Sequence, residues 1–453
     1  MHFLTAAVWV FLAAHIGVVT SELVCEDVNG VCVESDSGSR KVNVFPNGNH
    51  EEGLHFVLKE EDCARVEDVS SLLAPLFPEL CQPKGCKLYN AIGQRWRSCA
   101  DLPVLEEAMV FLVPEHRPFM WPSIEVGHAV TIDHIDDLIG QQNLTVETLS
   151  TSPRVFRLHN FFTAEEADML VNHMLKNKDE SERLKRSSVG ATGYTVNSER
   201  TSENGFDNFS PVAMALKRRS FELLGFEEYK ESWVDGLQVL RYNLSTAYNP
   251  HMDPFPVGED QYHNYDSAGK GSNRYATILL YMTDVEEGGE TVFPKAPAAD
   301  GSMMPLAQAV DDVRERKLVE MFERRSWQER MVAECQHRLA VKPKKGDAIL
   351  FYSQNPDGTV DENSLHGGCP VLSGTKWAAN IWIWNGPRVG YTKLLEDGSL
   401  IDTLVPDEQP FVAVFHNMDV PGAELLWHDN WRDTDSFIGK IDIGKDLRVN
   451  TRS

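Results

Sequence analysis

The sequence predicts a mainly β protein with flanking helices, and three observations support that fold class. The chain of 453 residues is 42% hydrophobic and 25% charged, which is the balance of a globular protein with a sizeable core. Several segments between residues 236 and 384 carry the alternating or continuous apolar pattern of β-strands. No helical pattern recurs between one strand and the next, which argues against a parallel α/β sheet. We therefore expect a closed or sandwiched β core.

The N-terminal residues predict entry into the secretory pathway. Residues 3–20 form an apolar run without formal charge, and Val19 and Ser21 supply the small side chains of a cleavage site after Ser21. We expect residues 1–21 to be a cleaved signal peptide. An uncleaved anchor stays open, because the run is almost long enough to span a bilayer. The expected location is therefore the endoplasmic reticulum, in the lumen or membrane-anchored, or the extracellular space.

Residues 22–150 are expected to form a separate cysteine-rich region with one helix over 61–73. In an oxidising compartment its cysteines favour disulfides, and the spacing leaves their pairing open. Zinc is the weaker alternative, because the closest pair, Cys81 and Cys86, lacks a second close pair at finger spacing. Six of the eight cysteines lie before residue 100: Cys25, Cys32, Cys63, Cys81, Cys86 and Cys99.

Three sequons predict a glycoprotein, at Asn143, Asn208 and Asn243. Because Asn243 lies within a strand pattern, we expect it to remain unmodified.

After Pro153 the pattern changes to helices and strands. Thr163 and Glu166 form a capping box at the start of a helix, and a charged helical stretch over 306–337 indicates an exposed insertion spanning 296–337. Residues 388–453 are expected to be a β-rich C-terminal extension. The expected strands are 236–242, 275–282, 347–352, 377–384, 411–415 and 423–427.

Charge and hydropathy exclude two classes of partner. Lys and Arg number 43 against 68 Asp and Glu, so the formal net charge is −25 and no basic surface is available for a phosphate backbone. No apolar run beyond the N-terminus could span a bilayer. We expect no nucleic-acid partner and no membrane contact beyond a possible N-terminal anchor; no pattern predicts the oligomeric state.

His251, Asp253 and the distant His366 are the candidate metal ligands. Two imidazoles and one carboxylate, with positions left open for substrate and O2, suit a non-haem Fe(II) site. Residues i and i+2 of a strand point the same way, so His251 and Asp253 can reach one ion together. The motif by itself is weak, since His134 and Asp136 repeat the spacing without strand patterns or a second ligand nearby.

The segments around these residues resemble prolyl 4-hydroxylases of the Fe(II)/2-oxoglutarate-dependent dioxygenase superfamily, the plant and algal branch most closely. The resemblance covers residues 153–387. It is carried, in chain order, by Arg241-Tyr242, Tyr248–Asp253 (YNPHMD), Glu286–Thr291 (EEGGET), Val341–Ala348 (VKPKKGDA), Ser364–Val371 (SLHGGCPV) and Gly374–Trp377 (GTKW).

The resemblance implies a double-stranded β-helix, or jelly roll, as the catalytic core. It assigns iron binding and catalysis to His251, Asp253 and His366. Lys376, ten residues after the distal His, would anchor the far carboxylate of 2-oxoglutarate, where a buried ammonium is tolerable because a dianion arrives to pair with it. The family's other cosubstrate-site positions are matched by Tyr242, Thr291 and Trp382.

The same resemblance implies a peptide site and a disulfide. Tyr248 and Arg274 match peptide-binding residues, and Trp384 stands where the family has a histidine. We expect Trp384 to give the peptide groove a large apolar face and an altered sequence preference. Cys335 and Cys369 match a bridged pair.

The expected function is therefore that of a procollagen-proline 4-dioxygenase-like enzyme. It would hydroxylate peptidyl proline in secretory-pathway proteins and couple this to decarboxylation of 2-oxoglutarate to succinate and CO2. The cofactors implied are Fe(II), 2-oxoglutarate, O2 and L-ascorbate, and the partner is a proline-rich polypeptide. Two alternatives stay open: the same chemistry on another residue or small molecule, and a catalytically dead secreted binding module.

Overall fold

A computed structural model describes most of the chain and divides it into two compact units, Met1–Pro122 and Ser123–Ser453. The expected signal peptide, Cys25 and Cys32 lie outside the described residues. None of the helices in the described part of the chain is both long and apolar enough to cross a membrane. The described residues are 39–51, 53–82, 84–103, 107–135, 143–179, 181–189, 195–196, 200–396, 398–402, 411–417, 420–429 and 434–451.

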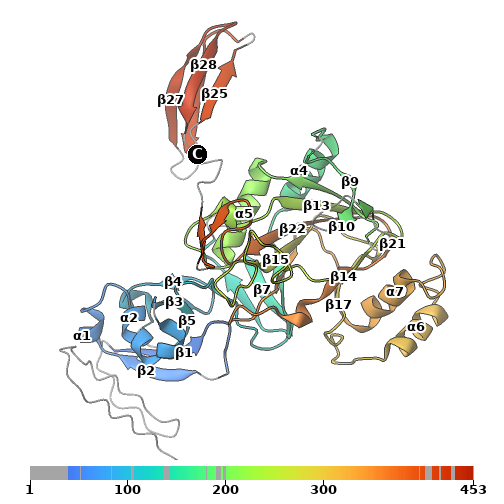
Figure 1. Cartoon of the computed structure of the whole chain (residues 1–453), viewed down its shortest axis with the longest axis horizontal. Coiled ribbons are helices and arrows are strands. Elements are labelled where there is room, and N and C mark those ends of the chain that lie inside the picture. The colour runs from blue at the N-terminus through green and yellow to red at the C-terminus, as the bar shows by residue number, and fades with distance from the viewer. Residues whose placement is uncertain are drawn as a thin grey trace, which may run out of the picture. The chain divides into compact units, whose positions relative to one another are not determined.

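The first unit is a small sheet with short helices (Figure 1). Strands β1 and β5 run parallel at its centre, and the other pairings are antiparallel. Disulfides join Cys63 to Cys99 and Cys81 to Cys86. The strands in spatial order are β2 (Leu54–Leu58), β1 (Arg40–Pro46), β5 (Ala108–Pro114), β3 (Cys86–Asn90) and β4 (Arg95–Trp96). The helices are α1 (Glu60–Cys63), α2 (Ser70–Leu73) and α3 (Pro78–Cys81) with 3-10 turns at Ala74–Leu76 and Cys99–Asp101.

The prediction of a single helix over 61–73 is wrong, because α1 and α2 are separate short helices. Between them the Asp68 carboxylate accepts the N–H of Ser70, and the N–H of Val69 donates to the Arg97 carbonyl. The turn at Asp68 and the bond from Val69 to the Arg97 carbonyl therefore interrupt the chain where the apolar spacing suggested a continuous helix.

The second unit contains two antiparallel sheets, which confirms the expected double-stranded β-helix. The larger sheet orders its described strands as β6 (Ala129–Ile132), β7 (Leu144–Thr151), β8 (Arg154–His159), β19 (Ala348–Tyr352), β15 (Arg274–Tyr281), β22 (Lys376–Trp384), β13 (Leu237–Tyr242), β12 (Glu203–Asp207) and β9 (Lys185–Arg186). The smaller sheet is β14 (Tyr248–His251), β20 (His366–Gly368), β17 (Thr291–Phe293) and β18 (Leu339–Val341). Two further pairs are β16 (Glu287–Gly288) with β21 (Val371–Ser373), and β10 (Ser188–Val189) with β11 (Thr195–Val196).

The boundary between the units lies at Pro122, earlier than the expected 150. Strands β6 and β7 pair in series with β8 and so extend the larger sheet. Cross-strand pairing, which local composition does not reveal, assigns these residues to the second unit.

Helices flank the β core. Helix α4 (Ala164–Lys176) begins at the expected capping box, in which the backbone N–H of Thr163 and of Glu166 each donates to the side chain of the other. Helix α5 (Pro211–Leu223) packs beside it, and the insertion forms α6 (Leu306–Glu315) and α7 (Trp327–His337). Cys335 of α7 is disulfide-bonded to Cys369, the pairing that the family resemblance implied.

The C-terminal segment is β-rich, as expected. Its first hairpin, β23 (Thr392–Leu394) and β24 (Leu400–Asp402), is hydrogen-bonded to the core through Ser232 and Asn264, so the core continues beyond 387. The remaining strands are β25 (Phe411–His416), β26 (Ala423–Asp429), β27 (Thr434–Ile441) and β28 (Asp446–Thr451).

Candidate active site

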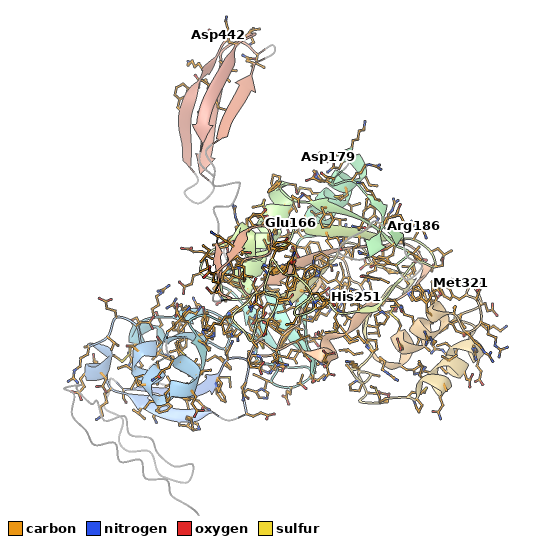
Figure 2. All side chains as sticks on the ribbon, viewed as in Figure 1. Glu166, Asp179, Arg186, His251, Met321 and Asp442 are labelled. Carbon is orange, nitrogen blue, oxygen red and sulfur yellow. A yellow bond between two sulfur atoms is a disulfide. The ribbon has the colours of Figure 1, made fainter. Side chains whose placement is uncertain are left out.

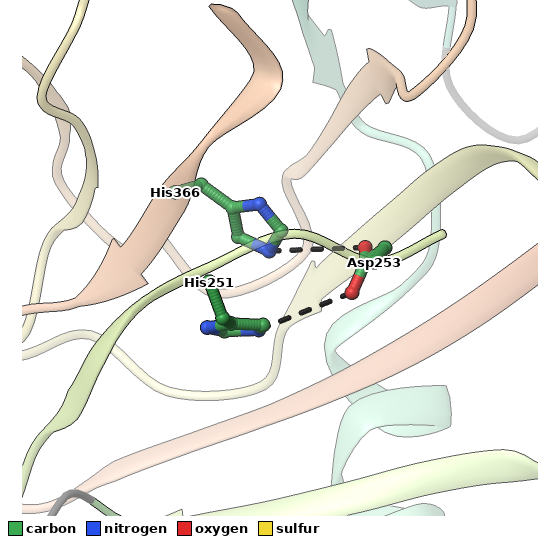
Figure 3. Close-up of side chains that lie close together, drawn as sticks. All are labelled: His251, Asp253 and His366. Carbon is green, nitrogen blue, oxygen red and sulfur yellow. Dashed lines mark ion pairs between the residues drawn. The ribbon is translucent and has the colours of Figure 1, made fainter. Parts of the chain in front are cut away.

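The smaller sheet brings His251 and His366 face to face. Strand β14 ends at His251, β20 begins at His366, and the two residues are direct partners in the antiparallel pairing. Asp253 follows β14 by two residues. Figure 3 shows the side chains of His251 and His366 directed towards Asp253. The two imidazole centroids are 4.6 Å apart. Topology thus unites residues that lie more than a hundred positions apart in the chain.

Hydrogen bonds from neighbouring residues orient the side chains of His251, Asp253 and His366. The Nδ1 of His251 lies 2.9 Å from the Asn249 carbonyl, and that of His366 lies 3.0 Å from the Ser364 carbonyl. Each Nδ1 therefore carries the proton and donates it, which leaves each Nε2 with a free lone pair for a metal. The Thr277 hydroxyl donates to Asp253 Oδ2 at 2.5 Å and holds that carboxylate in place.

Electrostatics keep His251 and Asp253 in their metal-binding forms. Burial, reinforced by neighbouring His366, lowers the pKa of His251 far below its ordinary value, so this imidazole is neutral at physiological pH. Burial alone would raise the pKa of Asp253, but the two imidazoles, Arg274 and the Thr277 hydrogen bond outweigh it and lower that pKa. The site therefore presents a neutral imidazole at His251 and an ionised carboxylate at Asp253.

The donor set fits a non-haem Fe(II). One donor atom from each residue lies within 4.8 Å of the other two, and the Asp253 carboxylate oxygens are 3.9 Å from His251 Nε2 and 3.7 Å from His366 Nε2. Three ligands on one face leave positions for O2 and a bidentate cosubstrate. His134, of the repeated motif, is not part of this cluster, and Asp136 lies outside the described residues.

A pocket extends from the two histidines to Lys376. Tyr242, Tyr248 and Thr291 also line it. The Lys376 side chain is 2% exposed, and its ammonium lies over the rings of Tyr242 and Tyr281 at 5.3 and 5.6 Å. Burial lowers the pKa of Lys376 to about 8, a shift that the nearby Glu290 partly opposes. A buried cation facing a metal site across a small pocket suits a short dicarboxylate that also chelates the metal.

The depressed pKa of Lys376 predicts a pH-dependent demand for 2-oxoglutarate. Below pH 8 the ammonium is charged and pairs with the dianion. Above it the free protein carries a neutral amine that must take up a proton on binding, so affinity should fall about ten-fold per pH unit. We expect the KM for 2-oxoglutarate to be flat near pH 7 and to rise above pH 8. Steady-state KM values between pH 7 and 9.5 test this, and a constant KM would contradict it.

Two predicted cosubstrate residues line the pocket. The Thr291 hydroxyl lies 2.9 Å from the Tyr281 hydroxyl, which donates to it. Tyr242 is 3% exposed, and its hydroxyl is directed towards Ser202 and Gly368. Both residues therefore line the pocket that joins Lys376 to the two histidines.

The predicted peptide-binding residues lie to either side of the metal ligands. The Tyr248 ring stacks on His251 with centroids 3.8 Å apart, and the Arg200 guanidinium lies over Tyr248 at 4.5 Å. Arg274 stacks on Trp382 at 3.8 Å and donates through Nε to Asp235 at 2.9 Å. Trp382, expected at the cosubstrate, thus lies beside Arg274 and is not among the residues lining the Lys376 pocket.

The expectation that Trp384 lines the peptide groove is wrong. Its side chain is 1% exposed, packed among Phe255, His263 and Tyr265, and its indole N–H donates to Asp235 at 3.2 Å. The large ring is covered because the segment after Asp253 folds back over the end of β22. A peptide cannot reach a side chain enclosed in this way.

Three residues at the site were missed in the sequence. Thr277 orients Asp253, Arg200 stacks on Tyr248, and Asp235 anchors Arg274. Thr277 carries a weak signal, as a hydroxyl on an otherwise apolar strand pattern. Arg200 and Asp235 carry none, because only folding brings them to the ligands.

The jelly roll, the His-Asp-His donor set and the buried lysine together define the class of Fe(II)/2-oxoglutarate-dependent oxygenases. In agreement, residues 237–384 match the family model of the 2OG-Fe(II) oxygenase superfamily. The chain belongs to this family, in its prolyl 4-hydroxylase-like branch. The family uses Fe(II) as its metal and consumes 2-oxoglutarate and O2.

Plant proteins place it in that branch. It is 35% identical to the Arabidopsis thaliana protein named probable prolyl 4-hydroxylase 8, over 54% of this chain and 74% of that one. It is also 35% identical to probable prolyl 4-hydroxylase 10 of the same plant, over 52% of this chain and 71% of the relative. Among solved structures, a viral collagen prolyl hydroxylase from Paramecium Bursaria Chlorella virus-1 aligns with 22% identity and a TM-score of 0.32, covering 51% of this chain and 95% of the viral one.

Proposed function

We propose that this protein hydroxylates proline residues in polypeptides of the secretory pathway. The observation that carries the proposal is the His251, Asp253 and His366 donor set facing a buried Lys376, in a chain whose relatives are prolyl 4-hydroxylases. In the net reaction one oxygen atom of O2 enters the peptide C–H bond as a hydroxyl. The other enters succinate as 2-oxoglutarate loses CO2.

Each part of the site has a task in that reaction. The bound iron supplies the oxidising chemistry between O2 and 2-oxoglutarate. Lys376 pairs with the far carboxylate of the cosubstrate, and its buried surroundings exclude water from that pair. Tyr248 and the Arg274–Trp382 stack flank the ligands and hold the peptide with its target C–H bond close to the metal. L-ascorbate is the proposed reductant that maintains Fe(II).

A proline-rich peptide suits the residues around the metal. Such peptides already adopt an extended polyproline II conformation, so binding orders few further torsions, and aromatic surfaces accept them well. Tyr248 and Phe255 are partly exposed aromatic side chains near the ligands, and Arg274 can donate to peptide carbonyls. These features favour a prolyl peptide over a small-molecule substrate.

Succinate production tests this function directly. The full chain is incubated with Fe(II), ascorbate and 2-oxoglutarate, with poly-L-proline or with polyglycine, and succinate and 4-hydroxyproline are quantified. We expect poly-L-proline alone to stimulate succinate release and to acquire hydroxyproline. Succinate release without peptide stimulation would assign the chemistry to another substrate. No release under any condition would support a catalytically dead binding module.

The sequons predict where a secretory route would leave glycans. Strand β13 ends at Tyr242, so Asn243 lies in an exposed turn and not inside a strand, contrary to expectation; Asn143 is also exposed. The Asn208 amide donates to Glu182 at 3.0 Å, and its Oδ1 packs against Gly236. We expect glycans at Asn143 and Asn243 but not at Asn208.

To test this prediction, the variants Asn143→Gln, Asn208→Gln and Asn243→Gln are expressed in secretory cells, and their masses are compared with and without endoglycosidase. The first and third variants should each lose one endoglycosidase-sensitive mass step, and Asn208→Gln should lose none. An unglycosylated wild-type protein from secretory cells would contradict both the route and the assignment.

A further inference from the structure

The segment 254–273, which joins β14 to β15 beside the metal ligands, is tied down at its base. Asn273 is 1% exposed, and its side-chain amide donates to the carbonyls of Phe255 and Tyr265 at 2.8 and 3.1 Å while its Oδ1 accepts the N–H of Phe255. One buried amide thus closes both ends of the segment. The segment 254–273 is therefore held by side-chain hydrogen bonds and is not an open loop.

The Trp384 side chain packs against aromatic residues of this segment. Phe255 and Tyr265 stack on each other at 5.0 Å, and both rings, with that of His263, contact Trp384 at centroid distances of 5.7 to 6.2 Å. The aromatic cluster formed by Phe255, His263, Tyr265 and Trp384 therefore connects the segment to the end of β22. Packing of this kind orders rings without any ligand.

The same tryptophan also fixes Arg274. The Trp384 indole N–H and the Arg274 Nε donate to one oxygen, Asp235 Oδ2, at 3.2 and 2.9 Å. The Arg274 guanidinium is then held between the rings of Trp382 at 3.8 Å and Phe255 at 5.0 Å. Loss of the indole N–H would remove one of the two donors to Asp235 Oδ2 and so weaken the hold of Asp235 on Arg274.

The C-terminal hairpin completes the arrangement through His263. Thr392 of β23 lies 3.2 Å from His263 Nδ1, and His263 Nε2 lies 3.2 Å from the Ser272 hydroxyl, which donates to the Pro387 carbonyl. Because Ser272 already donates, its oxygen accepts from Nε2–H, and Thr392 donates to Nδ1. A chain of hydrogen bonds thus runs from the hairpin into the segment.

We propose that Trp384 is a positioning residue: the aromatic cluster, Asp235 and the Thr392–His263 bond hold Arg274 and the segment 254–273 in the peptide-binding arrangement before peptide arrives. This inference rests on the proposed function. A preformed surface spares the ordering cost that a mobile one would incur on binding, so its loss should weaken peptide binding and leave the chemistry at the metal unaffected.

Two variants of the full chain test the proposal. Trp384→Phe retains a ring but removes the N–H donor to Asp235, and Thr392→Val removes the hydroxyl donor to His263. With poly-L-proline as the probe, we expect the peptide KM to rise about ten-fold and about three-fold respectively, as for hydrogen bonds to charged and neutral groups. In Thr392→Val, kcat and the KM for 2-oxoglutarate should change less than about two-fold. Thr131→Val, on the exposed face of β6, is the matched control.

Limited trypsin digestion supplies a readout independent of turnover. Lys270 is exposed on the segment, and cleavage after it should accelerate in both variants but not in the control. Unchanged cleavage, or faster cleavage with an unchanged peptide KM, would overturn the positioning role. If poly-L-proline fails to stimulate even the wild-type protein, the proposed function fails. Faster cleavage of the variants would then still support the inference that Trp384 and Thr392 hold the segment 254–273 in place.

Discussion

Alanine at His251, Asp253 or His366 is expected to abolish iron binding and turnover. Each change removes one of three ligands whose donor atoms lie within 4.8 Å of one another, and two ligands cannot hold Fe(II) with the same affinity or geometry. Even loss of a residue that only orients a ligand typically costs ten- to a hundred-fold, so loss of a ligand should cost at least about a hundred-fold. Iron content after gel filtration and succinate formation measure the two effects separately.

Matched variants separate ligation from general damage. His134→Ala, in the repeated motif outside the cluster, should retain iron and activity. Thr277→Val leaves all three ligands in place but removes the hydroxyl that donates to Asp253, so an intermediate loss of iron affinity is expected. Near-normal turnover in any of the three ligand variants would refute the metal assignment.

Lys376→Met should raise the KM for 2-oxoglutarate steeply while the protein stays folded and loaded with iron. Removing one partner of a buried charge pair costs ~2–5 kcal/mol, which corresponds to at least about a thirty-fold rise in KM. In the absence of cosubstrate, the buried ammonium is desolvated, and its ring contacts and the nearby charge of Glu290 offset this only in part. The free energy of unfolding of the apo variant should therefore be unchanged or higher than that of wild type.

Kinetics and thermal unfolding of the same preparations test this pair of expectations. Lys344→Met, at a side chain that is 61% exposed, is the control and should alter neither quantity. An unchanged cosubstrate KM in Lys376→Met would show that another cation anchors the dicarboxylate. A collapse in stability without added 2-oxoglutarate would show that Lys376 is a structural residue.

Features that repeat along a strand or a helix could be predicted from the chain alone. Alternation and apolar runs predicted β13, β15, β19 and β22 to within about a residue, since pleating forces side chains to alternate between faces. The capping box at Thr163 was equally readable, because its donors and acceptors lie three residues apart. The candidate iron ligands and Lys376 could be named because the motifs around them occur in order.

Contacts between residues distant in the chain could not be read in this way. Whether Trp384 faces a peptide or the core depends on where residues 254–273 fold, and its aromatic character permits both. The placement of β6 and β7 in the larger sheet depends on their pairing with β8. Thr277, on β15, and Asp235, just before β13, acquire their roles only when folding brings them beside Asp253 and Arg274. Local patterns determined the elements and the ligand types, whereas burial and hydrogen-bond partners were decided by tertiary packing, because solvent exclusion and directional bonds depend on proximity in space.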